Sequence, residues 1–296
     1  MTEDSGSTVL ADTGSWNYEE AFSRNLGLVT VKEQERLRRA RVAIPGMGGV
    51  GGIHLMTLAR LGVGAFNIAD PETYEVANLN RQYGAATTTV GRSKVHTMAE
   101  HALGVNPDLD LRIFEEPIVA DNVGAFLEGV DLVVDGLDFF ALAARRVLFR
   151  QAAQRDLYVI TAGPIGFSAA MLVFDPKGMA FDDYFDLRDD QDEVAQLVRF
   201  GVGLTPKATH LGYMDLGRVS MEARKGPSLG LATDLCAALV ATEAVRILLG
   251  RGPVKAAPHY VQVDAMGRVF KRGYMPWGNR NPIQRFKLWF VGRRYL

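Results

Sequence analysis

The chain has 296 residues, 48% of them hydrophobic, and its 33 basic and 34 acidic residues give a net charge of −1. That balance is typical of a globular protein without a global basic field, so general nucleic-acid binding is not expected. A single cysteine, Cys236, excludes an internal disulfide framework and a cysteine-built zinc site. The sequence opens with no secretory signal pattern, and no uncharged apolar run reaches about 18 residues. We therefore expect a cytoplasmic protein.

The first 40 residues divide into a polar tail and a helical lead-in. Residues 1–15 are small and polar, and we expect a disordered tail there. Residues 16–28 become rich in apolar side chains, with Arg24 in their middle. Thr30, followed three residues later by Glu33, is typical of a capping box and predicts a helix over residues 31–39.

Residues 42–70 predict a strand, a glycine turn, a helix over about 50–61 and a second strand ending at Asp70. Gly46, Gly48 and Gly51 occupy the G-x-G-x-x-G positions of the turn. The first glycine permits the tight turn, the second lets backbone approach a phosphate, and the third lets the helix pack closely. The helix N-terminus attracts an anion, and Asp70 is placed to bind ribose hydroxyls. This unit predicts a nucleotide site but would serve an NAD enzyme as readily.

A polar block after Asp70 favours a triphosphate. Asn78, Asn80, Arg81 and Gln82 lie within five residues, and Lys94 follows at the start of the next predicted helix. Two cations and an amide beside a phosphate turn exceed what the diphosphate of a dinucleotide requires. They suit a triphosphate whose leaving group must be held while negative charge develops on it. Taken alone, two cations like these would usually be ordinary surface charges.

Strands and helices alternate through the middle of the chain. We predict helices at residues 91–103, 121–127 and 142–155, and strands at 110–115, 131–135 and 157–162. This alternation favours a doubly wound, mostly parallel sheet. Asp138 follows the strand at 131–135, at the sheet edge where such folds bind ligands. It could instead cap the next helix.

The pattern changes after Ser168. We predict a strand at 169–174, a loop over the acidic, aromatic residues 181–190, a glycine-rich mobile crossover at 201–228 and a buried helix at 231–249 ended by Gly250. We also predict a hairpin over 259–263 and 268–271, around the sequence A-M-G. The expected fold is α/β, a doubly wound, Rossmann-like sheet with an antiparallel extension. We expect one triphosphate-binding domain over 16–272 and a basic, aromatic tail over 273–296.

Several motifs, in order and over residues 22–250, carry a family resemblance. They are F-S-R-N-L-G, V-A-I-P-G-M-G-G-V-G-G, L-A-R-L-G-V-G, N-L-N-R-Q, G-R-S-K, the N-P at Asn106, V-V-D-G-L-D and A-T-E-A-V-R-I-L-L-G. The chain resembles the ubiquitin-activating-enzyme-like adenylyltransferases of the ThiF/MoeB/HesA family. The resemblance implies that a substrate carboxylate attacks the α-phosphorus of ATP, giving an acyl-adenylate and pyrophosphate. The substrate would be the C-terminus of a ubiquitin-like or sulfur-carrier protein, a peptide, or a modified nucleotide.

The resemblance also implies roles for individual residues. The nucleotide would be cradled by Gly46, Gly48, Gly49 and Gly51, with Asp70 on the ribose. The phosphates would be lined by Asn78, Arg81 and Lys94, with Gln82 nearby. Asp138 would hold Mg²⁺. Arg24 matches an arginine that reaches the partner protomer's ATP, which implies a homodimer, although a surface salt bridge is the simpler alternative.

Three departures from the family narrow the expectation. The chain lacks the two C-x-x-C pairs that bind zinc in many members, so no zinc is expected, and residues 201–228 contain no cysteine to carry a thioester. Cys236, inside the late apolar helix, is expected to be a buried structural residue. Phe139 replaces the family's asparagine after Asp138. A non-catalytic dimer partner or scaffold therefore remains an alternative, and an NAD-dependent oxidoreductase is a weaker one.

The tail at 273–296 interleaves apolar and basic side chains. The apolar ones are Ile283, Phe286, Leu288, Trp289 and Phe290, and the basic ones are Arg285, Lys287, Arg293 and Arg294. Such a segment could contact a membrane surface or a partner protein. It could equally pack on its own domain or at the dimer interface.

Overall fold

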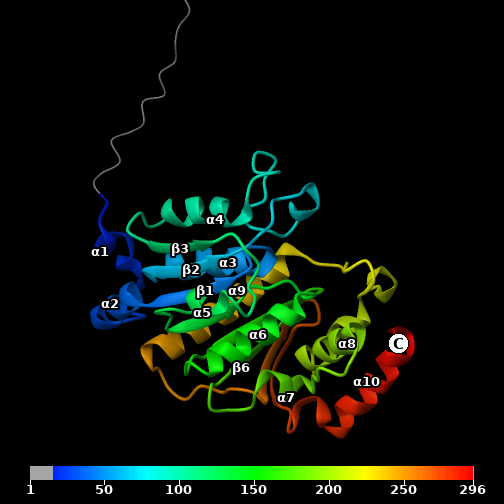
Figure 1. The fold of residues 1–296 in the computed structure, drawn as a ribbon. Coiled ribbons are helices and arrows are strands. Elements are labelled where there is room, and N and C mark those ends of the chain that lie inside the picture. Colours follow the sequence, from blue (N-terminus) through cyan, green and yellow to red (C-terminus); the bar gives the residue numbers. More distant parts are fainter. Residues whose placement is uncertain (1–15, 296) are drawn as a thin grey trace, which may run out of the picture.

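A computed structural model describes residues 16–295, so the tail predicted at 1–15 lies outside the described residues. An eight-stranded sheet of order β3-β2-β1-β4-β5-β6-β7-β8 runs through the molecule (Figure 1). Its strands are β1 (Arg41–Pro45), β2 (Ala65–Ala69), β3 (Asp110–Phe114), β4 (Leu132–Asp135), β5 (Val159–Ile165), β6 (Ser168–Phe174), β7 (His259–Asp264) and β8 (Val269–Tyr274). The five strands from β3 to β5 pair in parallel, and β6, β7 and β8 pair antiparallel. The predicted fold class is confirmed.

Helices cover both faces of this sheet. The longer ones are α2 (Val31–Arg39), α3 (Gly49–Arg60), α4 (Lys94–Leu103), α6 (Leu142–Ala153), α8 (Glu193–Leu204), α9 (Gly230–Leu249) and α10 (Pro282–Tyr295). The shorter ones are α1 (Tyr18–Ala21), α5 (Val123–Phe126) and α7 (Phe181–Phe185). In Figure 1, α5 and α6 lie in front of the sheet and α9 behind it. Among the described residues, no helix combines the length and apolarity that a membrane crossing requires.

Two hydrophobic cores lie on opposite faces of the sheet because side chains alternate along each strand. Val42 and Ile44 of β1 pack in the core that also holds α3, α4 and α9. Ala43, between them, packs in the core that holds α5, α6 and α7. All five residues of β1 are buried, as a central parallel strand requires. The strand is apolar from Val42 to Pro45 because helices cover both faces of the sheet at β1.

The predicted helix ends are found where local chemistry specifies them. Thr30 and Glu33 form the capping box of α2, with the Thr30 amide donating to Glu33 Oε2 at 2.8 Å. Gly250 ends α9 in the left-handed conformation, at φ +68°. Ser93 caps α4, so that helix begins at Lys94 and not at residue 91.

The loop predicted at 181–190 is wrong, and the crossover predicted at 201–228 starts four residues too early. The expected loop at 181–190 contains α7, whose aromatic side chains are buried. The expected crossover at 201–228 begins inside α8, which Asp192 caps by accepting the Ala195 amide at 2.8 Å. The glycines and acidic residues of these segments are uncommon inside helices, so the sequence did not predict α7 or α8. In α8, however, Leu197, Phe200 and Leu204 recur at helical spacing and are buried.

The C-terminal part is built onto this region. Residue 273, where we placed the start of the tail, lies inside β8. The helix that follows, α10, packs against α8 and lies at the edge of the molecule (Figure 1). The tail therefore contacts its own domain through one side of α10.

Candidate nucleotide-binding site

Three close backbone contacts build the glycine turn between β1 and α3. Gly46 has φ +86°, and a Cβ there would lie 2.3 Å from the carbonyl oxygen of Gly136. A Cβ on Gly51 would lie 1.7 Å from the Gly46 carbonyl oxygen. Gly136 follows β4 and itself has no room for a Cβ, because Gly46 O would be 2.6 Å away. These three glycines bring α3 and the end of β4 against the turn, and the fold itself requires them.

Gly48 and Gly49 differ from those three. A Cβ on Gly48 would meet its nearest atom, Gln82 Nε2, at 3.6 Å, and one on Gly49 would meet Thr233 Cγ2 at 3.4 Å. Both are ordinary contact distances, so packing within the described chain leaves room for a side chain at each position. Gly48 also offers no side-chain cap to the first amides of α3. An open, uncapped helix N-terminus of this kind suits a phosphate.

Asp70 follows β2 and holds the turn in place. Its Oδ2 accepts the Met47 amide at 2.6 Å, and its Oδ1 accepts the Glu72 amide at 2.8 Å. Burial raises the pKa of this carboxyl, whereas these two amides act to lower it. Each carboxylate oxygen keeps lone pairs beyond the single bond it accepts. Asp70 therefore positions the glycine turn and retains the capacity to accept ribose hydroxyls.

Lys94 opens α4 beside Asp70. Its side chain is only 5% exposed, and its Nζ lies 2.6 Å from Glu72 Oε2, whose side chain is 68% exposed. The surface-charge alternative for Lys94 is therefore wrong. Asn78 is also buried, and its Oδ1 accepts the Glu75 amide at 2.9 Å. Asn78 thus shapes the loop after β2 through its carbonyl oxygen.

Arg81 and Gln82 lie across the glycine turn. Arg81 Cγ is 4.0 Å from the Cβ position of Gly49. Its Nη1 donates to Ala77 O at 2.8 Å and Asn80 Oδ1 at 3.0 Å, and within residues 16–295 it pairs with no carboxylate. Gln82 is buried, and its Oε1 has no hydrogen-bond partner in that part of the chain. The atom nearest the open Cβ position of Gly48 is thus an amide donor, Gln82 Nε2, and Arg81 adjoins Gly49 without a carboxylate partner among the described residues.

A buried ion pair supports the other wall of the site. Asp135 Oδ2, at the end of β4, accepts Arg145 Nε and Thr161 Oγ1, each at 2.7 Å. Arg145 also donates to Leu137 O at 2.6 Å, which fixes the loop that carries Asp138. Our sequence reading did not single out Asp135 as a site residue. Its signal was a carboxylate inside an apolar strand with an arginine on the next helix.

Asp138 stays exposed at this edge. Its Oδ1 accepts the Phe140 amide at 2.9 Å, whereas α6 begins after Ala141 without a side-chain cap, so the helix-capping alternative is wrong. Among the described residues, no three or more His, Cys, Asp or Glu side chains gather as a metal cage. Mg²⁺ is typically held by one or two carboxylates together with substrate phosphates. Asp138 therefore fits a nucleotide-bound Mg²⁺.

A family model described as the ThiF family matches residues 22–281. The chain belongs to the ThiF family. A sulfur carrier protein adenylyltransferase from Thermus thermophilus is 30% identical over 272 residues, which cover 90% of this chain and 92% of that protein. A tRNA threonylcarbamoyladenosine dehydratase from Haemophilus influenzae is 33% identical over 162 residues, 54% of this chain and 60% of that protein.

These similarities agree with the predicted class, an ATP-dependent adenylyltransferase. The ThiF-family chain spans only 54–60% of the length of several curated relatives. A crystal structure of E. coli MccB with ATP has a TM-score of 0.67 and 17% identity, covering 92% of this chain and 75% of that one. At this identity the match supports the fold.

Arg24 lies far from the glycine turn of its own ThiF-family protomer. The adjacent Asn25 donates through Nδ2 to Leu61 O at 3.2 Å, directly after the last residue of α3. The turn is at the other end of this 12-residue helix, about 18 Å away at 1.5 Å per residue. Arg24 is exposed, and so are its apolar neighbours Leu26 and Leu28. It can therefore contribute to a nucleotide site only by reaching the site of another protomer.

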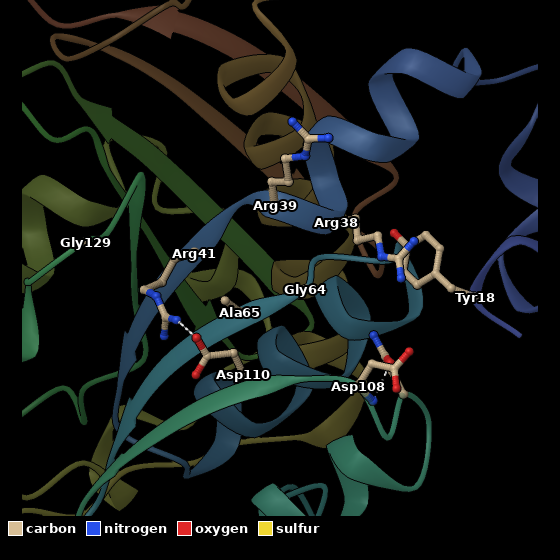
Figure 2. Close-up of a pocket in the computed structure, with 10 residues that line it drawn as sticks. Tyr18, Arg38, Arg39, Arg41, Gly64, Ala65, Asp108, Asp110 and Gly129 are labelled. Carbon is tan, nitrogen blue, oxygen red and sulfur yellow. Dashed lines mark hydrogen bonds and ion pairs between the residues drawn. The ribbon is translucent and has the colours of Figure 1, made fainter. Parts of the chain in front are cut away.

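A separate hollow of about 400 Å³ lies near the amino ends of β1 and β2 (Figure 2). Its cations already have partners. Arg38 stacks on Tyr18 at 4.5 Å, and Arg41 pairs with Asp110 and donates to Asn67 Oδ1 at 2.9 Å. The glycine turn is at the opposite, carboxyl edge of the sheet. This hollow is therefore distinct from the nucleotide site.

Proposed function

We propose that this chain activates a substrate carboxylate with ATP, giving an acyl-adenylate and pyrophosphate, without a thioester on the enzyme. One observation carries the proposal: the backbone open at Gly48 and Gly49 adjoins the amide donor Gln82 Nε2 and Arg81, and Arg81 has no carboxylate partner among the described residues. Such a site matches a polyphosphate in charge and in shape. The relatives' names favour two substrate classes, the C-terminus of a carrier protein or peptide and a modified nucleotide.

The reaction needs alignment and charge neutralisation, and it needs no general base. A carboxylate is ionised at neutral pH and can attack the α-phosphorus directly, while the bond to the bridging oxygen breaks and pyrophosphate leaves. Arg81 and the N-terminus of α3 hold the phosphates. Lys94 lies near the ribose, because it pairs with Glu72, whose amide donates to the ribose-binding Asp70. Asp138 would hold Mg²⁺, which neutralises charge on the departing diphosphate.

The position of the single cysteine supports the absence of a thioester step. Cys236 is fully buried in α9, and burial raises the pKa of its thiol. A thiol that is neither accessible nor ionised is a poor nucleophile. The acyl group therefore leaves the adenylate by release or by transfer to an external nucleophile. Cys236→Ser should leave the activity unchanged.

The place of Arg24 supports a homodimer with shared sites. Because Arg24 lies about 18 Å from its own glycine turn, it serves a nucleotide only in the partner protomer. Leu26, Leu28 and Val31 are 44%, 79% and 71% exposed beside it, and they offer an apolar contact surface for a second copy. Mixing inactive Arg24→Ala and Arg81→Ala chains tests this arrangement. Random heterodimers restore one intact site each, about a quarter of the wild-type activity, and no recovery would contradict the shared site.

The activity itself is tested by ATP–pyrophosphate exchange. Labelled pyrophosphate should enter ATP only when Mg²⁺ and a suitable carboxylate, such as a carrier-protein C-terminal peptide, are both present. Arg81→Ala should abolish exchange, and Arg92→Ala is the matched control because Arg92 pairs with Glu100 on the exposed side of α4. ATP binding without exchange for any carboxylate would favour a non-catalytic partner. NAD binding in place of ATP would favour an oxidoreductase.

A further inference from the structure

The C-terminal helix α10 buries a polar side chain and exposes large apolar ones, the reverse of what a helix that only covers a core does. Toward α8 it buries Gln284, whose Nε2 donates to Val202 O at 3.1 Å, and it directs Lys287 Nζ to Pro206 O at 2.5 Å. Its outward side carries large apolar side chains that are 53–67% exposed, namely Ile283, Phe286, Trp289 and Phe290. Helices on a globular domain normally place apolar residues inward and polar residues outward. The outward side is therefore built for an apolar contact outside the described chain.

The charge around this helix is one-sided. Residues 265–296 hold eight of the 33 basic residues of the chain and none of its 34 acidic residues. Arg285 and Arg293 of α10 make no ion pair within the described residues, and the Arg293 guanidinium stacks on the Trp289 ring at 4.0 Å. A second copy docking through the same face would oppose two like-charged surfaces, which is unfavourable. The positive charge around α10 instead favours an anionic partner on its outward side.

The arrangement of the apolar side chains favours a fluid surface over a folded partner. Ile283, Phe286 and Phe290 follow the i, i+3, i+7 spacing and form a row of about 10 Å along a helix at the edge of the molecule (Figure 1). Phe286 and Trp289 pack together, with ring centroids 5.9 Å apart. A bilayer accepts such a protruding row without shaped holes, and Trp, Phe and Arg on one face are typical of helices that lie in the headgroup region.

We propose that the outward side of α10 docks this protein on a membrane surface rich in anionic lipids. Ile283, Phe286 and Phe290 enter the interface, and Arg285 and Arg293 contact the headgroups. The helix lies in the plane of the surface, since the described chain has no helix able to span a bilayer. Its inner side is already fixed, because Asn279 Nδ2 donates to Phe185 O at 2.9 Å and Arg199 O at 2.8 Å just before α10. Binding therefore needs no folding step.

Vesicle flotation with the full chain tests the proposal. The protein should float with phosphatidylcholine vesicles that contain about 30% phosphatidylserine and remain unbound with phosphatidylcholine alone. Trp289 fluorescence should shift to shorter wavelength on the anionic vesicles only, a shift that Trp289→Phe should reduce. Ile283→Ser/Phe286→Ser/Phe290→Ser should lower the partition coefficient at least about a hundredfold. Arg285→Ala/Arg293→Ala should lower it about 25-fold, at about fivefold per residue.

A control variant and the contrary outcomes make the test decisive. Leu103→Ser/Val119→Ser removes exposed apolar residues elsewhere on the chain and should leave flotation unchanged. No flotation with either vesicle overturns the proposal, and dimerisation abolished by the triple variant would then identify a second copy as the occupant. If the triple variant still binds anionic vesicles as the wild type does, the attraction is non-specific and electrostatic, and this result also overturns the proposal. If the triple variant does not fold, the arginine variant and the fluorescence shift still decide.

Discussion

Replacing Gly48 with Ala should separate nucleotide binding from folding. The added Cβ would meet Gln82 Nε2 at 3.6 Å, an ordinary contact, so the fold can accommodate it. The remaining effect on stability is the poorer capping of α3 by alanine, about 1 kcal/mol, or a melting temperature lower by about 2–4 °C. The same methyl group would stand where a phosphate approaches the backbone. Loss of one charged hydrogen bond, worth about 1.5–3 kcal/mol, weakens ATP binding about 10- to 100-fold.

Titration calorimetry with Mg-ATP and thermal unfolding measure the two effects separately. Gly51→Ala is the matched control, because its Cβ would lie 1.7 Å from the Gly46 carbonyl oxygen. That overlap with backbone should destabilise the protein by about 3 kcal/mol or more, so this variant loses stability first. If Gly48→Ala binds ATP with wild-type affinity, phosphate does not approach the turn at Gly48. If it unfolds as readily as Gly51→Ala, the space at Gly48 has been misjudged.

Three further predictions concern buried polar groups. Lys94→Met removes a buried cation and should weaken ATP binding about 10- to 100-fold by calorimetry; unchanged affinity would mean that Lys94 serves only Glu72. Arg145→Met leaves the Asp135 carboxylate buried without its cation, which should cost about 3–5 kcal/mol in urea unfolding; a loss under about 1 kcal/mol would contradict this. Burial lowers the pKa of His54 from 6.5 to about 3, so its contribution to stability is complete above pH 6.5 and is lost as the pH falls toward 3. The free energy of unfolding should fall by about 2 kcal/mol between pH 6.5 and about 5 through this group, and His54→Leu should remove that slope; equal slopes would refute it.

The sequence allowed the fold to be predicted best where neighbouring residues specify the backbone. The capping box of α2 and the end of α9 depend on side chains within a few residues, so their patterns are local. The glycine turn was predictable for the same reason. Only the structure shows which of these glycines the fold itself requires. A Cβ on Gly51 would overlap the backbone of the turn, whereas a Cβ on Gly48 would only touch the side chain of Gln82.

The features that sequence reasoning missed depend on contacts between distant segments. Asp135 and Arg145 lie on different elements, and their pairing with Thr161 of β5 requires the sheet order. α7 is stabilised by burial of aromatic rings against other elements, as in the Phe149–Phe181 contact with centroids 4.3 Å apart. A short acidic segment of this kind has little helical preference of its own. Tertiary packing therefore determined these elements.

The same packing explains the departure at Phe139 without implying a lost site. The ring centroids of Phe139 and Phe200 of α8 are 5.3 Å apart. The Arg145 guanidinium stacks on the same Phe200 ring, 4.7 Å from its centroid. Arg145 in turn holds Asp135 and the loop that presents Asp138. An asparagine at position 139 would leave this aromatic contact unfilled, so phenylalanine here is matched to α8. Phe139 thus packs with Phe200 and Arg145, and this packing keeps Asp138 at the edge of the sheet, where a nucleotide-bound Mg²⁺ would need it.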